Sequence, residues 1–223
     1  MSKDTLPKII LHNSISIDGS LTNFEPHMGL HYQIAANYKP DAHLIGSNTI
    51  KTGVELFGEG ISPEENNDFK KPIRNLNLPY WVIIDTQGSL KGLLHTCRRF
   101  EFCRDVIVLA SKSTPKIYLK YLKERNYDYH IVGSNKVNLN KALELLSQKY
   151  KIKTILTDTG KILGNLLLNQ GLVSEISLLI HPIIVGKKSY NTFYDVINNL
   201  NLILLKREIL EKQYVWLVYK VEK

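Results

Sequence analysis

The feature that most constrains the fold of this chain is the segment 154–186, TILTDTGKILGNLLLNQGLVSEISLLIHPIIVG. Its pattern predicts a buried strand, a Thr-Gly turn, an amphipathic helix closed by Gly171, and a second strand that ends at His181. A helix that follows a strand through a glycine turn presents backbone N–H groups and its positive end outward. Such an end suits an anionic ligand, for example the phosphates of a nucleotide.

Other short apolar runs resemble buried strands of a parallel sheet, and helical periodicity separates several of them. The strands are expected at 9–16, 43–46, 81–85, 106–110, 129–132 and 154–157, and helices at 116–125 and 139–149. Near the C-terminus, strands at 202–210 and 214–221 follow each other through a turn at 211–213, with no helix between them. The sequence therefore predicts an α/β fold with a mostly parallel sheet and antiparallel strands at its C-terminal end.

The length of 223 residues and the 43% hydrophobic content suffice for one well-buried domain or two small ones. No Pro/Gly/Ser-rich linker or repeat divides the chain, so we predict a single domain over residues 1–223. Residues 58–77, rich in Glu, Asn, Pro and Lys, are expected to form a long mobile surface loop.

Several classes of protein are disfavoured. No run approaches the roughly 20 apolar residues of a membrane span, so we expect a soluble, cytoplasmic protein with no membrane partner. The net charge of +8 comes from dispersed lysines and not from a basic block, which argues against nucleic acid as a partner. Cys97 and Cys103 match neither a redox pair nor a common zinc site and are expected to be reduced thiols. His27 and His31 lack a third ligand at a recognisable spacing, so no metal is expected.

In open α/β sheets, ligands bind beyond the carboxyl ends of the parallel strands, and this chain places polar residues there. The segment Gly46 to Thr49 opens a helix and can receive a phosphate. Lys112 stands between two serines, and a lysine with flanking hydroxyls suits a phosphate dianion. Taken alone, these segments are better explained as an ordinary helix cap and loop, and Asp18-Gly19 after the first strand as a simple turn.

The segments NSISIDG (13–19), DAHLIGSNT (41–49) and PYWVIID (79–85), and the helix that ends in Gly-Leu-Val before Glu175, occur in an order that resembles the riboflavin-pathway pyrimidine reductases. The resemblance implies a dihydrofolate-reductase-like, three-layer α/β/α fold, NADPH as cofactor, and a homodimer. The implied reaction reduces the ribosylamino side chain of a diaminopyrimidinone 5′-phosphate by hydride transfer to a ring-opened imine.

The resemblance also implies roles for residues at the strand ends. Asp18 is the expected catalytic residue, and substrate contacts are expected from Asn13, Ser16 and Asp18. Contacts to the cofactor are expected from Gly46, Thr49, Asp85, Thr86, Lys112, Gly133, Asp158, Thr159 and Gly160. At Gly160 we expect no room for a Cβ beside the pyrophosphate and a turn with positive φ. The homodimer is expected to use the edges of the apolar strands 176–180 and 214–221.

Three positions depart from the family pattern. Asp158-Thr159-Gly160 replaces a run of glycines, no acidic pair follows Thr49, and His12 stands where many relatives have Asn. Two alternatives therefore stay open. The chain is a reductase of another pterin or imine on the same fold, or a nucleotide-binding protein without catalysis.

Overall fold

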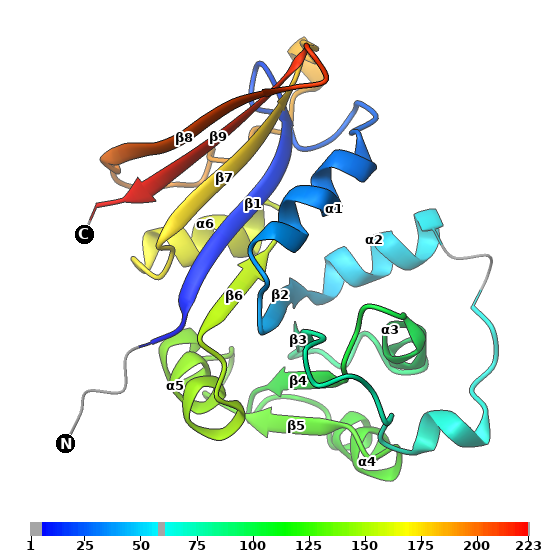
Figure 1. The fold of residues 1–223 in the computed structure, drawn as a ribbon. Coiled ribbons are helices and arrows are strands. Elements are labelled where there is room, and N and C mark those ends of the chain that lie inside the picture. Colours follow the sequence, from blue (N-terminus) through cyan, green and yellow to red (C-terminus); the bar gives the residue numbers. More distant parts are fainter. Residues whose placement is uncertain (1–5, 58–60, 223) are drawn as a thin grey trace. The chain divides into compact units, whose positions relative to one another are not determined.

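A computed structural model describes residues 6–57 and 61–222 of the chain (Figure 1). Its residues group into two compact units, each described separately below. Among the described residues, the first unit comprises 6–7 and 41–153, and the second comprises 8–40 and 154–222. The organisation of residues 1–223 as a single domain stays a prediction.

The first unit contains four parallel strands in the order β5-β4-β3-β2. The strands are β2 (Ala42–Gly46), β3 (Tyr80–Ile84), β4 (Val106–Ala110) and β5 (Asp128–Ile131). The helices are α2 (Ser47–Phe57), α3 (Leu94–Arg99), α4 (Lys116–Glu124), α5 (Leu139–Tyr150) and the short 3-10 helix η1 (Asn66–Phe69).

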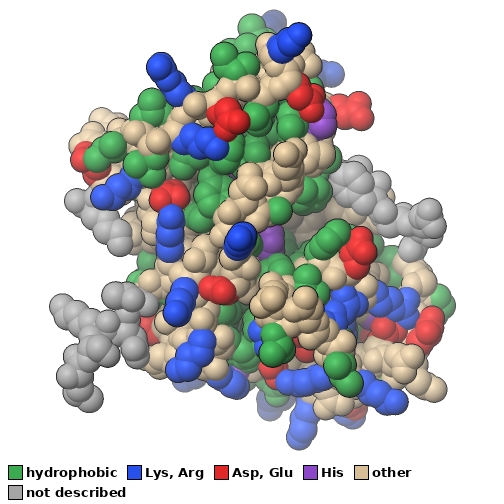
Figure 2. Space-filling model, in the orientation of Figure 1, with side chains coloured by type: hydrophobic (Ala, Val, Ile, Leu, Met, Phe, Trp, Pro, Cys, Tyr) green, Lys and Arg blue, Asp and Glu red, His purple; other side chains and the backbone are tan. Residues whose placement is uncertain are grey.

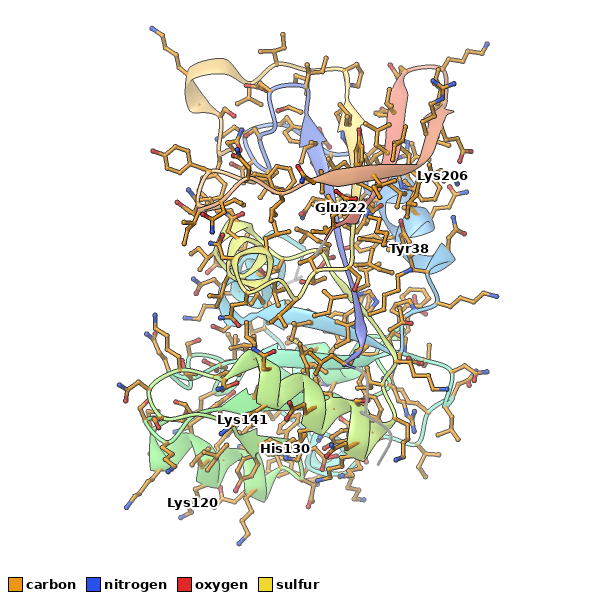
Figure 3. The ribbon with its side chains drawn as sticks, turned by 90° about the vertical axis from the view of Figure 1, so that its left-hand side faces the viewer. Tyr38, Lys120, His130, Lys141, Lys206 and Glu222 are labelled. Atoms are coloured by element: carbon orange, nitrogen blue, oxygen red, sulfur yellow. The ribbon has the colours of Figure 1, made fainter. Side chains whose placement is uncertain are left out.

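Alternation along these strands sends side chains to both faces of the sheet. On one face, Ile83 and Val108 pack with Leu94 of α3 and Leu122 of α4 in a buried apolar cluster. On the other face α5 lies over the strands (Figure 3) and buries Leu139, Leu143 and Leu146. Each fully buried leucine or isoleucine stabilises the fold by about 1.5–3 kcal/mol relative to an exposed one. The first unit is thus a helix–sheet–helix sandwich.

The segment 61–77 is held in place by charged side chains, although the sequence predicted a mobile loop over 58–77; residues 58–60 lie outside the described residues. Glu64 receives Arg125 Nη2 at 2.6 Å, and Arg99 pairs with Asp68. Arg98, 3% exposed, donates to the carbonyl of Asp68 at 2.8 Å. These contacts bind the segment to α3 and to the end of α4.

The second unit contains five strands in the order β6-β1-β7-β9-β8. They are β1 (Lys8–Ser16), β6 (Thr154–Thr157), β7 (Glu175–His181), β8 (Leu202–Leu210) and β9 (Tyr214–Val221). β6, β1 and β7 are parallel, whereas β9 runs antiparallel to both β7 and β8. The helices are α1 (Met28–Asn37), α6 (Lys161–Asn169) and the 3-10 helix η2 (Gly186–Lys188).

Helices cover both faces of this second sheet as well. Leu30 and Ile34 of α1 pack against Leu179 and Trp216. On the opposite face, Gly164 of α6 faces Leu11, whose Cδ1 would lie 3.5 Å from an added Cβ. Gly171 ends α6 with φ of +64°, a conformation that favours glycine. The predicted strand–helix–strand segment is therefore confirmed, including its stop at Gly171.

The predicted edge strands are wrong. β7 pairs with β1 and β9, and β9 pairs with β7 and β8, so both are internal. The edge is β8, whose side chains are almost all exposed and include Leu205 at 52% and Ile209 at 72%. Lys206 lies on the same strand (Figure 3), with Nζ 3.5 Å from the centre of the Trp216 ring. Sequence patterns identify strands, but the order of strands depends on pairing between distant segments.

Three expectations from the sequence, about charge, cysteines and membrane spans, can be compared with the structure. Lysine and arginine side chains are scattered over the visible surface (Figure 2) and form no single block on that face. Cys97 and Cys103 are both free and buried, and burial raises the pKa of the Cys97 thiol to about 12. Within residues 6–57 and 61–222, no helix has the length and apolar character needed to cross a membrane.

Candidate functional site

In the first unit, the predicted cofactor residues lie where the parallel strands end. Gly46 is the last residue of β2, and α2 begins at the next residue, as the sequence predicted. Thr49 lies in the first turn of α2 and is partly exposed. Asp85 follows β3 and is buried. Its carboxylate accepts hydrogen bonds from the backbone N–H groups of Ser89 and Leu90 at 3.0 and 2.9 Å, which compensate for the loss of water. This carboxylate shapes the turn, and the neighbouring Thr86 is partly exposed.

The structure brings the loops after β4 and β5 together. The backbone N–H of Lys112 donates to the carbonyl of Gly133 at 3.1 Å, and Ser113 Oγ donates to the carbonyl of Asn135 at 3.0 Å. Ser111 Oγ lies 2.8 Å from Ser113 Oγ. The Lys112 side chain is exposed beside these hydroxyls. An exposed cation with adjacent hydroxyl groups is chemically suited to a phosphate.

Gly133 has a structural requirement for glycine. Its φ is +105°, and an added Cβ would lie 2.2 Å from the carbonyl oxygen of Lys136 and 2.9 Å from the backbone nitrogen of Asn138. The loop from Gly133 to Asn138 closes tightly because Asn138 donates its N–H to the carbonyl of Val132 at 2.9 Å. Only a residue without a Cβ fits this loop.

In the second unit, Asn13 of β1 lies against the turn after β6. Its Nδ2 donates to the carbonyl of Thr159 at 3.4 Å, and it is 4% exposed. Its Oδ1 is buried and has no hydrogen-bond partner among the described residues. A buried acceptor without a donor is costly, which makes this atom unusual among buried polar groups.

Gly160 caps α6, as predicted, but the expected conformation is wrong. Its φ is −64° and ψ is 173°, an extended conformation open to any residue. Among the described residues, nothing lies within 4 Å of an added Cβ. The protein itself therefore does not require glycine here, and Gly160 lies exposed at the start of the helix.

Asp18 follows β1 and is engaged by three donors. Ser16 Oγ donates to its Oδ1 at 2.6 Å, and the backbone N–H groups of Val185 and Gly186 donate at 3.1 and 2.9 Å. The bond from Ser16, followed by those from Val185 and Gly186, lowers the pKa of Asp18 to about 2. Asp18 is therefore a carboxylate at neutral pH, and a direct proton-donor role, which needs a raised pKa, is not supported.

Sequence reasoning missed a polar group on the other face of β1. His12 and Ser14 point toward α1, where both contact His31, and His31 lies beside Asp158. The available signal was three successive polar residues, His12 to Ser14, inside a strand that is otherwise apolar. Such residues in a buried strand are expected to be hydrogen-bonded, so they indicate polar partners on a neighbouring element.

Comparisons with solved structures give the same fold at low sequence identity. A pyrimidine reductase-like protein from Corynebacterium diphtheriae aligns with a TM-score of 0.74 at 18% identity, over 97% of this chain and 92% of that chain. The riboflavin biosynthesis reductase Rib7 of Saccharomyces cerevisiae aligns with a TM-score of 0.65 at 19% identity, over 100% and 93% of the two chains.

RibD from Acinetobacter baumannii aligns with a TM-score of 0.71 at 18% identity, and this chain spans 60% of its length. These likenesses confirm the predicted dihydrofolate-reductase-like α/β fold. No protein with a curated description matches the sequence. Because the model of the RibD C-terminal domain matches residues 7–215, nearly the whole chain, this protein belongs to the RibD C-terminal domain family.

Proposed function

We propose that this protein is an NADPH-dependent reductase of riboflavin biosynthesis that reduces the ribosylamino side chain of a diaminopyrimidinone 5′-phosphate. The observation that carries the proposal is the turn after β6. There Gly160 opens α6 with free space around it, and Asn13 presents a buried acceptor without a donor among the described residues. Family membership and the names of the similar reductases support the same chemistry.

Each unit, taken by itself, offers groups that suit part of a dinucleotide. Lys112 and its neighbouring hydroxyls supply a site for a phosphate, and Thr159-Gly160 supplies a helix start. Gly46, Thr86 and Gly133, at or just after strand ends, and Thr49, in the first turn of α2, are proposed contacts of the cofactor. Asp85 holds the turn that carries Thr86. Asp158 is the exception, because a carboxylate near a pyrophosphate is repulsive.

The proposed reaction asks little of the protein beyond alignment and a source of protons. When bound, NADPH supplies a hydride from its nicotinamide ring. We propose that Asn13, Ser16 and Asp18 contact the substrate side of the site, and that ionised Asp18 orders the substrate through bound water. A proton for the imine nitrogen then comes through that water and not from Asp18 itself.

Oxidation of NADPH, followed at 340 nm with the ribosylamino-pyrimidinone phosphate, tests this function. Turnover with this substrate supports the proposal. Turnover only with another imine or a pterin would indicate a different reductase on the same fold. Binding of NADPH, detected by its fluorescence, without turnover of any substrate would indicate a nucleotide-binding protein that lacks catalysis.

The protein is expected to bind NADPH more tightly than NADH. Lys112→Ala should remove most of this preference, because charge-assisted contacts to the 2′-phosphate contribute about 1.5–3 kcal/mol. Titration calorimetry with both cofactors measures the preference. Lys116→Ala, an exposed lysine at the start of α4, is the matched control and should leave it unchanged. Equal affinity of the wild-type protein for the two cofactors would contradict the expectation.

Gly160→Val should weaken NADPH binding more than folding. The extended backbone and open space around Gly160 accommodate a side chain, so the fold should lose only about 1 kcal/mol from the poorer helix cap. Thermal unfolding and NADPH titration of the same variant separate the two effects. Normal NADPH affinity in the folded variant would show that the cofactor does not approach this turn.

We also propose that the protein forms a homodimer through the edge strand β8. This strand exposes Leu202, Ile203, Leu204, Leu205 and Ile209. Exposed apolar edges of this kind are normally covered by another chain or element. Light scattering should give about twice the 25.6 kDa chain mass. Ile209→Lys should shift the mass toward monomer, whereas Ile117→Lys on α4 should not; a wild-type monomer at micromolar concentration would refute the proposal.

A further inference from the structure

A chain of polar side chains joins the buried strand β1 to the turn after β6 within the second unit. His31 of α1 stacks on His12, with ring centres 4.4 Å apart and planes inclined by 27°. Ser14 Oγ lies 3.0 Å from His31 Nδ1. On the other side of the ring, His31 Nε2 lies 3.7 Å from Asp158 Oδ2. The stack and the serine fix the ring so that Nε2 faces the carboxylate.

The two ends of this chain differ in access to solvent. The His31 side chain is 8% exposed, whereas that of Asp158 is 23% exposed. Asp158 is followed by Thr159, whose carbonyl accepts from Asn13, and then by Gly160 at the start of α6. The Asp158 carboxylate, next to the turn that begins α6, is therefore the more solvent-exposed of the two groups, and the His31 imidazole is the more buried one.

Three other titratable groups near His31, namely His12, His181 and Tyr32, are neutral near pH 7. Burial, and then the charge of His31, lower the pKa of His12 to about 3. Burial also lowers the pKa of His181 on β7, with smaller effects from His27 and His31. Tyr32 stands edge-on to His31 at 5.2 Å, and burial, together with the charge of Asp158, raises its pKa. Asp158 is thus the charged group that His31 faces most directly.

This arrangement matters because a carboxylate beside a phosphate is repulsive. At the few ångströms that separate neighbouring groups in a site, like charges near a protein surface repel strongly enough to change affinity several-fold. A protonated imidazole within about 4 Å of the carboxylate cancels that charge. A side chain that exchanges its proton near neutral pH is the natural group for this task.

We propose that His31 is a positioning residue of the cofactor site: when protonated, it neutralises Asp158, so that binding of the dinucleotide is coupled to proton uptake and is tighter at low pH. The inference rests on the proposed function, because it takes Thr159-Gly160 as the turn that meets the pyrophosphate. It explains how this chain keeps a carboxylate in a turn that binds anions.

Calorimetric titration with NADP⁺ from pH 5.5 to 8.5 tests the coupling. The wild-type protein should bind about 5–10-fold more tightly at pH 5.5 than at pH 8.5, beyond the change seen in Asp158→Asn. The 2′-phosphate of the ligand itself titrates at a pKa of about 6, but this contribution is common to all variants. Titration in two buffers of different ionisation enthalpy should show proton uptake by the wild-type protein that exceeds the uptake by Asp158→Asn.

The variants separate charge from shape. His31→Gln should bind about 5–10-fold more weakly at pH 5.5 and keep only the pH dependence of the ligand. Adding Asp158→Asn to it should restore the affinity, which loss of packing around His31 would not allow. His130→Gln, a half-buried imidazole on β5 of the first unit, is the matched control and should behave as wild type. Should His31→Gln not fold, Asp158→Asn alone still decides the question.

The outcomes are distinguishable. Equal pH dependence in the wild-type protein and in Asp158→Asn would overturn the coupling while leaving the proposed function intact. Failure of every variant, including Asp158→Asn, to bind NADP⁺ at any pH would overturn the proposed function and the coupling with it.

Discussion

Asp18→Asn is expected to reduce turnover by about 10²-fold or more while leaving the NADPH dissociation constant near its wild-type value. The carboxylate lies at the end of β1 and is held by Ser16 and by the N–H groups of Val185 and Gly186. Asparagine has the same shape but no charge, so it cannot order the substrate through an ionised group. Steady-state kinetics at saturating NADPH and a separate binding titration measure the two quantities.

The same substitution has a structural consequence that the control must separate. An amide offers one acceptor oxygen where the carboxylate offers two, so the substituted side chain cannot satisfy both Val185 and Gly186. If Asp18 acted only by holding this loop, the loss of turnover in Asp18→Asn would be accompanied by a loss of thermal stability, which thermal unfolding followed by circular dichroism measures. Full activity in Asp18→Asn would remove Asp18 from the mechanism.

The protonation state of Asp18 gives the direction of its pH dependence. Its folded-state pKa, about 2, lies below its ordinary value of 3.8, so its contribution to stability is present above pH 3.8 and is lost as the pH falls through about 2. Between about pH 5 and 8 Asp18 stays ionised, and no change of activity in that range should trace to this group.

Gly133→Ala is expected to destabilise the protein by about 3 kcal/mol or more, with or without cofactor. Two penalties combine. The backbone has φ of +105°, where residues with a Cβ are strained, and the new Cβ would lie 2.2 Å from the Lys136 carbonyl oxygen. The loop that places the Gly133 carbonyl on Lys112 must therefore shift. Denaturant unfolding followed by circular dichroism measures the loss.

Gly92→Ala separates the two penalties. Gly92 also has a positive φ, +80°, but among the described residues nothing lies within 4 Å of an added Cβ. It should cost only about 1–2 kcal/mol, the conformational part alone. If the two variants were equally stable, the crowding around Gly133 would have no energetic weight, and its glycine would be explained by conformation only.

Much of the fold was determined by local sequence pattern. Apolar runs located β4 at Val106–Ala110 and β6 at Thr154–Thr157 without error, and the turn between β8 and β9 was found from three polar residues. Gly171 ended α6 because a helix commonly stops at a residue with positive φ. These features depend on residues close in sequence, so periodicity and turn chemistry are sufficient to predict them.

Tertiary structure decided which of these segments meet. Only the pairing of β9 with both β7 and β8 shows that the exposed edge is β8, and only the fold brings His31 and Asp158, 127 positions apart in the sequence, within 3.7 Å. The sequence likewise predicted Asp18 as the catalytic residue. Two of its three donors, the N–H groups of Val185 and Gly186, lie in a loop that no local pattern connects to Asp18. Contacts between distant segments set strand order and the charge state of the site, because both depend on which groups become neighbours after folding.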